Sequence, residues 1–164
     1  EMKRWDLMKS IDVRGTYMVS KYAIPLIKED FNAHILTLSP PLNLDKVWFG
    51  KHLGYTMAKY GMSMTVLGLA AELRPYKIAA NALWPKTTIA TAAVQNLLGG
   101  NDLVERSRNP EIMADAAWSI VNKPSENFSG RFLIDEDVLR ESGISDFDQY
   151  AVTPGGPLMP DLFL

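Results

Sequence analysis

The chain has 164 residues, 47% of them hydrophobic and 22% charged, with a formal net charge of −2 at pH 7; these values are typical of a folded globular domain and exclude a disordered or collagen-like chain. Its 17 basic and 19 acidic residues form no block of one sign, which argues against a nucleic-acid partner. The absence of cysteine excludes disulfides and thiol nucleophiles, the two isolated histidines give no expectation of a metal site, and no apolar run approaches the ~18 residues of a membrane span.

The first half of the chain predicts a helix, a strand and a second helix. Apolar and small residues recur every three or four positions between 5 and 29, which predicts a helix that Pro25 kinks or ends. Residues 33 to 39 form a short β-prone run, AHILTLS, closed by two prolines. Small residues alternate with bulky ones at helical spacing between 55 and 73, so a long helix is expected there, able to approach its neighbours closely.

The second half of the chain again alternates predicted strands and helices. Residues 78 to 85, IAANALWP, predict a second buried strand, and 86 to 109 a loop with one helical piece. Proline at a favoured first helical position opens a helix over 110–122. A third strand is predicted over 130–139, GRFLIDEDVL. Helices alternating with buried strands are typical of a parallel α/β sheet.

The sequence predicts a domain boundary near residue 139. The charge run Asp135, Glu136 and Asp137 lies at the end of the third predicted strand and is interpreted as a solvated loop. The following segment, 140–164, is rich in proline and glycine, which is typical of an extended arm or linker. We therefore expect one domain over 1–139 and an arm over 140–164.

Tyr55 and Lys59 are the first candidates for chemistry. Positions four apart share one face of a helix, so the phenol and the ammonium would project into the same space near the helix N-terminus. A free phenol, with a pKa of about 10, is a weak acid–base group at neutral pH. A nearby ammonium and the positive helix end both favour the phenolate. The spacing therefore predicts an acid–base pair.

The pair alone leaves an alternative open, namely a half-buried tyrosine beside a solvated lysine. Its surroundings favour a site, because one predicted strand ends at Ser39 before it and another ends at 81–85 after it. In a parallel sheet, ligands bind beyond the carboxyl ends of the strands. Trp48 and Trp84 flank this region, where they either line an apolar substrate site or fill the core.

Several motifs together resemble the short-chain dehydrogenase/reductase family. They are GTYMVSKYAIPLI, YTMAKYGMSM and NALWPKT, and SPPLNL and YAVTPGGPLMPDLFL are similar to a hydroxysteroid dehydrogenase-like group within the family. The resemblance spans nearly the whole chain. It implies a Rossmann-like doubly wound parallel sheet, of which this chain carries the C-terminal half, strands five to seven and their helices. The implied activity is NAD(P)-dependent oxidation or reduction of an apolar, steroid- or fatty-acyl-like alcohol or carbonyl compound.

The resemblance also implies roles for individual residues. Tyr55 would transfer the proton, and Lys59 would hold the nicotinamide ribose and lower the tyrosine pKa. Ser39 matches the serine that polarises the substrate oxygen, although the family's second serine is replaced here by Pro40. Asp12 stands where the family has an asparagine that supports the lysine through a water.

The cofactor implied by the resemblance is NADP or NAD. Pro85 begins the turn that in the family is proline–glycine and is Pro-Lys here. The residues expected to bind the cofactor are Tyr55, Lys59, Pro85, Thr88, Ile89 and Thr91. The family's glycine-rich phosphate-binding loop has no counterpart in the 164 residues.

Without the first four strands, the strand at 33–39 would present unpaired backbone groups along an apolar edge. We therefore expect a homo-oligomer or a larger assembly that covers this edge. The family's usual dimer packs two helices that are both present here, and Gly15, Gly61 and Gly68 suit such close packing.

Two further functions remain open at this stage. One is a catalytically silent, reductase-derived structural subunit of a larger assembly, favoured by the missing loop, by Pro40 and by Asp12. The other is an acyl or sterol carrier, which depends on the resemblance alone. An intracellular protein is expected, and the resemblance suggests a peroxisome or a mitochondrion.

Overall fold

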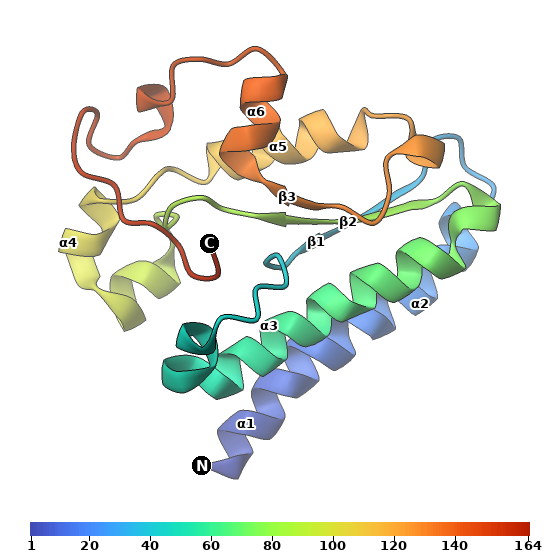
Figure 1. Cartoon of the computed structure of the whole chain (residues 1–164), viewed down its shortest axis with the longest axis horizontal. Helices are drawn as coiled ribbons and strands as arrows, with labels where there is room; N and C mark the ends of the chain where they lie inside the picture. Colours follow the sequence, from blue (N-terminus) through green and yellow to red (C-terminus); the bar gives the residue numbers. More distant parts are fainter. The chain divides into compact units, whose positions relative to one another are not determined.

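The computed structural model describes residues 1–164 and divides them into two compact units (Figure 1). The first unit comprises 1–84, 121–133 and Phe163. The second comprises 85–120, 134–162 and Leu164. No helix in the chain combines the length and the apolar character that crossing a membrane would require.

A nearly continuous helical run opens the first unit. It consists of α1 (Met2–Lys9), a π-helical segment η1 (Ser10–Arg14) and α2 (Gly15–Ile27). The predicted helical periodicity is confirmed, and α2 ends two residues after Pro25, the residue expected to end it. A π segment inside a helix shifts the register of the following side chains and occurs often at functional sites.

The sheet has the order β1–β2–β3. Strand β1 (His34–Leu38) runs parallel to β2 (Ala79–Trp84), with register from His34 against Ala79 to Leu38 against Leu83. Every residue of β2 is buried, as expected of the central strand. Strand β3 (Phe132–Ile134) lies on the other side of β2, and β1 forms the edge of the sheet (Figure 1).

The longest helix, α3 (Lys46–Glu72), begins earlier than the sequence predicts. Asp45 caps it by accepting a hydrogen bond from the Val47 N–H at 3.0 Å, which stabilises helix over residues predicted as loop. His52 has non-helical backbone angles and separates a short first piece from the long second one. Tyr55 therefore lies in the first turn of the second piece, as the sequence analysis expected.

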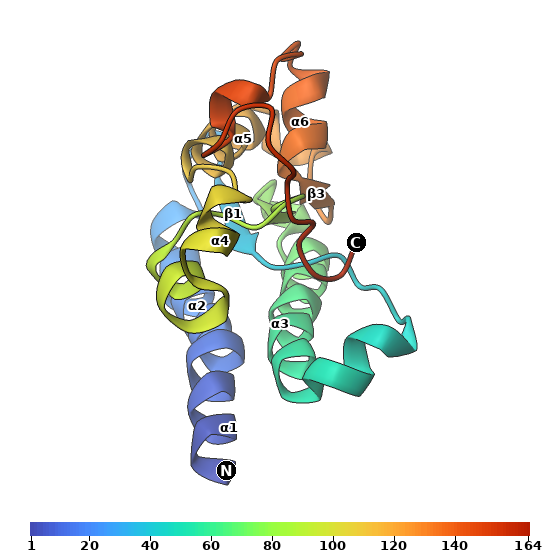
Figure 2. The ribbon, with the colours of Figure 1, turned by 90° about the vertical axis from the view of Figure 1, so that its left-hand side faces the viewer.

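The core of the first unit is formed where α3 packs on the sheet. Figures 1 and 2 show α2 and α3 running side by side, and α3 contacts β1 and β2. Buried aliphatic and small side chains fill this contact: Ala33, Leu69, Leu73, Ile78 and Ala80. Two short 3-10 turns, η2 (Arg74–Tyr76) and η4 (Ser125–Asn127), flank the starts of the strands.

The second unit is mainly helical. It contains η3 (Val94–Leu98), α4 (Gly100–Glu105), α5 (Glu111–Val121), α6 (Asp135–Glu141) and η5 (Asp148–Tyr150). Residues 140–162 pair with the segment after β2 instead of projecting as an arm. The Asn109 N–H donates to the Tyr150 carbonyl at 2.7 Å, and the Thr88 N–H donates to that of Met159 at 2.9 Å.

The predicted third strand over 130–139 is wrong in its second half. Strand β3 ends at Ile134, and α6 begins at Asp135. Three acidic side chains fall in the first turn of this helix, where the positive end of the helix dipole favours them. The side chain of Asp135 also accepts the Glu136 N–H at 2.6 Å, a local bond that competes with an extended strand.

Candidate active site

Ser39 lies immediately after β1, at the carboxyl end of the strand. It is only 1% exposed, and its hydroxyl has no hydrogen-bond partner. The loop that follows is held against α3, because the Ser63 hydroxyl donates to the Pro40 carbonyl at 2.7 Å. A buried hydroxyl without a partner is uncommon and is consistent with a group kept for a ligand.

Tyr60 must be distinguished from Tyr55, since both lie on α3. The Tyr60 hydroxyl donates to the Asn43 carbonyl and accepts from the Asn43 N–H at 3.2 Å. Burial raises the pKa of Tyr60, although the hydrogen bond to Asn43 opposes this shift. Tyr60 is therefore a structural residue that anchors the loop, and Tyr55 is left as the candidate acid–base group.

Lys59 lies between two other residues that were predicted to be catalytic, Tyr55 and Asp12. Its ammonium lies 5.7 Å from the centroid of the Tyr55 ring and 3.4 Å from the Asp12 Oδ2 atom. The side chains of Lys59 and Asp12 are 17% and 19% exposed, so this ion pair is largely shielded from water. The structure thus brings together three of the residues predicted from sequence, Tyr55, Lys59 and Asp12.

Asp12 reaches Lys59 through close helix packing. It belongs to the π-helical segment η1, and the neighbouring Val13 lies against Gly61 of α3. A Cβ atom added to Gly61 would meet the Val13 Cγ2 atom at 2.6 Å, so only glycine allows this approach. We predicted that Gly61 serves packing between copies of the chain; instead its close contact is internal. Gly68 has no atom within 4 Å of an added Cβ.

A set of aromatic rings surrounds Tyr55. Sequence reasoning considered only the two tryptophans, which lie on α3 and β2; the ring at the centre is Phe163, which is 1% exposed. Its centroid lies between 5.2 and 6.0 Å from the centroids of four rings: Trp48, Tyr55, Tyr60 and Trp84. We call these five residues the aromatic set. Phe163 was missed because it lies in a Pro/Gly-rich tail, where no periodicity marks buried positions.

The predicted cofactor-binding residues Pro85, Thr88, Ile89 and Thr91 belong to the second unit. Thr88 shares a hydroxyl–hydroxyl hydrogen bond of 2.7 Å with Ser107, and Ile89 forms a bridge with Arg108. The Thr91 hydroxyl accepts the Val94 N–H at 3.3 Å. These bonds fix the backbone after β2, and in them the Thr91 hydroxyl serves only as an acceptor.

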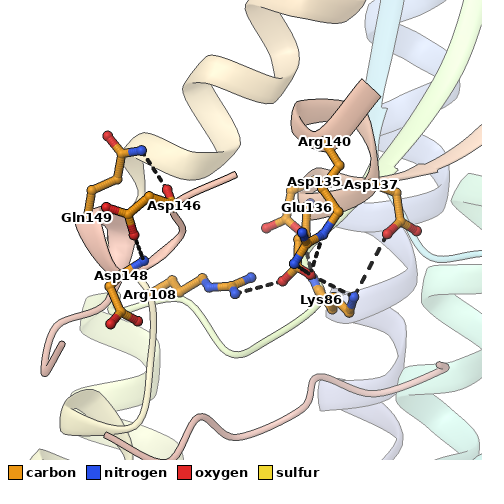
Figure 3. Close-up of polar contacts among 9 residues, drawn as sticks. All are labelled: Lys86, Arg108, Asp135, Glu136, Asp137, Arg140, Asp146, Asp148 and Gln149. Carbon is orange, nitrogen blue, oxygen red and sulfur yellow. Dashed lines mark hydrogen bonds and ion pairs between the residues drawn. The ribbon is translucent and has the colours of Figure 1, made fainter. Parts of the chain in front are cut away.

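The second unit also contains an ionic cluster centred on Glu136 (Figure 3). Its carboxylate lies 2.6 Å from a guanidinium nitrogen of Arg108, 2.8 Å from one of Arg140 and 2.9 Å from the Lys86 ammonium. Burial disfavours the charged carboxylate, but the hydrogen bonds from these three partners outweigh it and lower the pKa of Glu136 to about 2. The interpretation of the acidic run as a solvated loop is therefore wrong: all three residues are helical, and Asp135 and Glu136 are buried, although Asp137 is exposed.

The first unit thus combines a phenol, an ammonium and an unpaired buried hydroxyl with a set of aromatic rings. A phenol and an ammonium can transfer a proton to or from a carbonyl or alcohol oxygen, and a serine hydroxyl can polarise that oxygen.

Comparisons with known proteins identify the family of the chain. A family model described as enoyl-(acyl carrier protein) reductase matches residues 1–118. Hydroxysteroid dehydrogenase-like protein 2 of Danio rerio is 57% identical over 163 residues, which cover 99% of this chain and 39% of the relative. The chain thus spans well under half the length of this curated relative.

Two solved structures are similar throughout this chain. A short-chain dehydrogenase of Mycobacterium thermoresistibile is 54% identical with a TM-score of 0.91, covering 100% of this chain and 58% of that one. A candidate dehydrogenase of Xanthomonas campestris is 48% identical with a TM-score of 0.94, covering 100% and 60%. These matches confirm the predicted α/β class and a partial Rossmann-like sheet. The chain belongs to the short-chain dehydrogenase/reductase family.

Proposed function

We propose that the full-length protein is an NAD(P)-dependent oxidoreductase that acts on an apolar alcohol or carbonyl compound. The observation that carries the proposal is the array in which Lys59 lies over the Tyr55 ring and is paired with Asp12 at 3.4 Å. The comparisons support the class of enzyme through the family. The chain covers only part of its relatives, so the activity is proposed for the whole protein.

In the direction of reduction, Tyr55 gives its phenolic proton to the substrate oxygen. The Lys59 ammonium stabilises the phenolate that remains, because a positive charge nearby favours the ionised phenol. Ser39, whose buried hydroxyl has no partner, donates a hydrogen bond to the same oxygen. In the direction of oxidation, the phenolate accepts the alcohol proton.

The nicotinamide cofactor, when bound, supplies or accepts the hydride at the substrate carbon. The donors present fit such a group, since the Lys59 ammonium and the Tyr55 hydroxyl can bind the two hydroxyls of a ribose. The resemblance assigns the segment from Pro85 to Thr91 to the carboxamide.

An apolar substrate is favoured by the aromatic set around Tyr55. Large aromatic side chains line sites for apolar ligands, in which a few polar groups fix the orientation. The relative from Danio rerio is named hydroxysteroid dehydrogenase-like, and the matching family model is described as an enoyl-(acyl carrier protein) reductase. These two descriptions favour steroid-like or fatty-acyl-like compounds as the substrate class.

The alternative of a silent structural subunit is not favoured. Both chemical groups are retained, their geometry is assembled, and Asp12 takes the place of the supporting asparagine without displacing Lys59. A structural subunit would need neither the Lys59–Asp12 pair nor an unpaired hydroxyl at Ser39.

The test is a reduction assay on the full-length protein with NADH and with NADPH. The substrates are apolar methyl ketones and fused-ring ketones, and a small keto acid is the matched polar control. We expect the absorbance of one cofactor to fall with at least one apolar ketone and not with the keto acid. Absence of turnover with every apolar ketone, or a preference for the keto acid, would contradict the proposal.

A further inference from the structure

The backbone that follows β2 is held at its first amide by a side chain. Strand β2 ends at Trp84, and Pro85 has no N–H group, so Lys86 carries the first amide after the strand. This amide donates to the Asp135 Oδ1 atom at 2.8 Å (Figure 3). Pro85, Lys86 and Asp135 all belong to the second unit. The turn formed by Pro85 and Lys86 is thus anchored to the first residue of α6.

The next backbone bonds of this segment have partners of another kind. The Thr88 N–H donates to the Met159 carbonyl at 2.9 Å, and the Lys86 carbonyl accepts the Asp161 N–H at 3.1 Å. Both bonds join backbone to backbone, so they do not depend on the identity of a side chain. The Lys86 N–H does depend on one, and a substitution at Asp135 therefore releases the start of the segment alone.

Asp135 is fully buried, and one of its two oxygens is unpaired. The Oδ1 atom accepts the N–H groups of Lys86 and Glu136, whereas the Oδ2 atom is buried without a hydrogen-bond partner. Burial raises the pKa of the Asp135 carboxyl, although the two N–H bonds and the charge of Arg108 oppose this shift. Buried polar atoms in packed cores are almost always paired. A carboxyl kept under these conditions is consistent with a residue whose other oxygen has a specific task.

The position of the turn relates it to a ligand. The turn begins at the carboxyl end of β2, which runs parallel to β1, and ligands of parallel sheets bind beyond these strand ends. We propose that Asp135 is a positioning residue for the nicotinamide cofactor, which fixes the backbone of the Pro85–Lys86 turn through the Lys86 N–H. The inference rests on the proposed function, because it requires that this turn contacts the bound cofactor. Without the bond the turn is mobile, and ordering it on binding lowers the affinity.

The experiment compares Asp135→Ala and Asp135→Asn with the wild-type full-length protein. The Kd values for NADH and for NADPH are measured from cofactor fluorescence without substrate, and hydrogen exchange of the peptide 86–91 reports on the turn itself. We expect Asp135→Ala to raise the Kd of the cofactor that binds by about tenfold and to speed exchange in 86–91, because a hydrogen bond to a carboxylate is lost. Asp135→Asn should stay within about threefold of the wild type, since its amide oxygen can still accept the Lys86 N–H.

Glu136→Gln is the matched control on the same helix. The Glu136 carboxylate pairs with the Lys86 ammonium at 2.9 Å and not with the Lys86 N–H, so this variant weakens α6 and keeps the bond to the turn. Its Kd should stay within about twofold of the wild type, because a loss of stability leaves affinity unchanged while the folded state predominates. A Kd in Asp135→Ala no higher than in Glu136→Gln, or unchanged exchange in 86–91, overturns the inference and makes Asp135 a purely structural residue.

Failure of the inference can be told apart from failure of the proposed function. If the wild type binds neither NADH nor NADPH, the proposed function fails and the inference fails with it. If the wild type binds a cofactor and Asp135→Ala binds it equally well, only the inference fails. If Asp135→Ala does not fold, Asp135→Ser is judged by the same criterion, because its hydroxyl lies closer to the backbone and does not reach the Lys86 N–H.

Discussion

Ser39 differs from ordinary core residues in the state of its hydroxyl group. Its hydroxyl is buried, yet it has no hydrogen-bond partner. We predict that Ser39→Ala lowers kcat/KM about 100-fold, because one donor to the substrate oxygen is lost. The free energy of unfolding should stay level or rise by up to ~1 kcal/mol, since an unpaired buried polar group is removed.

The control for this prediction is Ser63→Ala. The Ser63 hydroxyl donates to the Pro40 carbonyl at 2.7 Å, so its loss should cost about 1 kcal/mol in thermal or urea unfolding. If Ser39→Ala were as destabilised as Ser63→Ala and fully active, Ser39 would be a structural residue.

Asp12 pairs with Lys59 at 3.4 Å, and we propose that it takes the supporting role of the family's asparagine. We predict that Asp12→Asn keeps kcat/KM within about threefold of the wild type, since the amide oxygen can still accept from the ammonium. Asp12→Ala should lose about tenfold, which corresponds to one charge-assisted hydrogen bond of ~1.5 kcal/mol. Equal losses in both variants would show that the negative charge itself, rather than an acceptor, is required.

Residues with a local pattern could be predicted from the sequence, and residues placed by tertiary contacts could not. Tyr55 and Lys59 are four apart on one helix, so their shared face follows from helical geometry alone. Phe163 reaches Tyr55 from the other end of the chain, and nothing in the local spacing of its tail specifies that contact. Ser39 could be placed at the end of a strand, but its unpaired hydroxyl could not be foreseen.

The close contact between η1 and α3 depends on Gly61. We predict that Gly61→Ala lowers the free energy of unfolding by about 1–3 kcal/mol, because its methyl group would clash with Val13. Gly68→Ala on the same helix is the matched control, with open space around it. It should be neutral or stabilising by up to ~1 kcal/mol.

A double mutant sharpens the test. Val13→Ala removes the atom that an added Cβ at Gly61 would meet, so combining it with Gly61→Ala should give less destabilisation than the sum of the single variants. Strictly additive effects in urea unfolding would mean that the two residues are not packed together.

The Glu136 cluster makes the stability of the second unit sensitive to acid. The pKa of Glu136 is about 2 in the folded protein against an ordinary value of 4.5. Stability from this group is therefore present above pH 4.5 and is lost as the pH falls toward 2, in total roughly 3 kcal/mol. Glu136→Gln should remove this pH-dependent part, measured by urea unfolding between pH 5 and 2.5.

The control for the cluster is Asp137→Asn. The Asp137 carboxylate is exposed and lies 3.8 Å from the Lys86 ammonium, so its contribution should be small. A pH dependence that survives in Glu136→Gln and disappears in Asp137→Asn would refute the assignment to Glu136.

The sequence predicted elements well where hydrophobic periodicity is strong. The helical run at the N-terminus and both strands β1 and β2 were found nearly at their observed bounds. The prediction failed at α6, because FLIDEDVL is apolar enough for a strand, and the burial of Glu136 depends on ion pairs with Lys86 and Arg108, which lie far away in sequence. Residues 46–53 were missed because the cap at Asp45 outweighs a run with little periodicity.

The unpaired edge of β1 is relevant to how the whole protein assembles. Within this chain, β1 pairs only with β2, so its other side presents backbone groups that can accept another strand. Members of this family are typically oligomeric, and we propose that the full-length protein covers this edge and forms a homo-oligomer or a larger assembly. The α/β class and the partial sheet could be predicted from the alternation of elements and from the motifs, whereas the partner of this edge cannot be identified from 164 residues that span 39% of a relative.

We propose that Tyr55 is the acid–base residue of an oxidoreductase. The most direct measurement is kcat/KM for an apolar ketone in the full-length protein carrying Tyr55→Phe, with Tyr22→Phe as the control at an exposed tyrosine. We predict a fall of about 10²- to 10⁴-fold for Tyr55→Phe, because the proton donor is lost while the ring is kept. The unfolding temperature should be unchanged and Tyr22→Phe should behave as the wild type. A Tyr55→Phe protein that keeps wild-type kcat/KM would contradict the account.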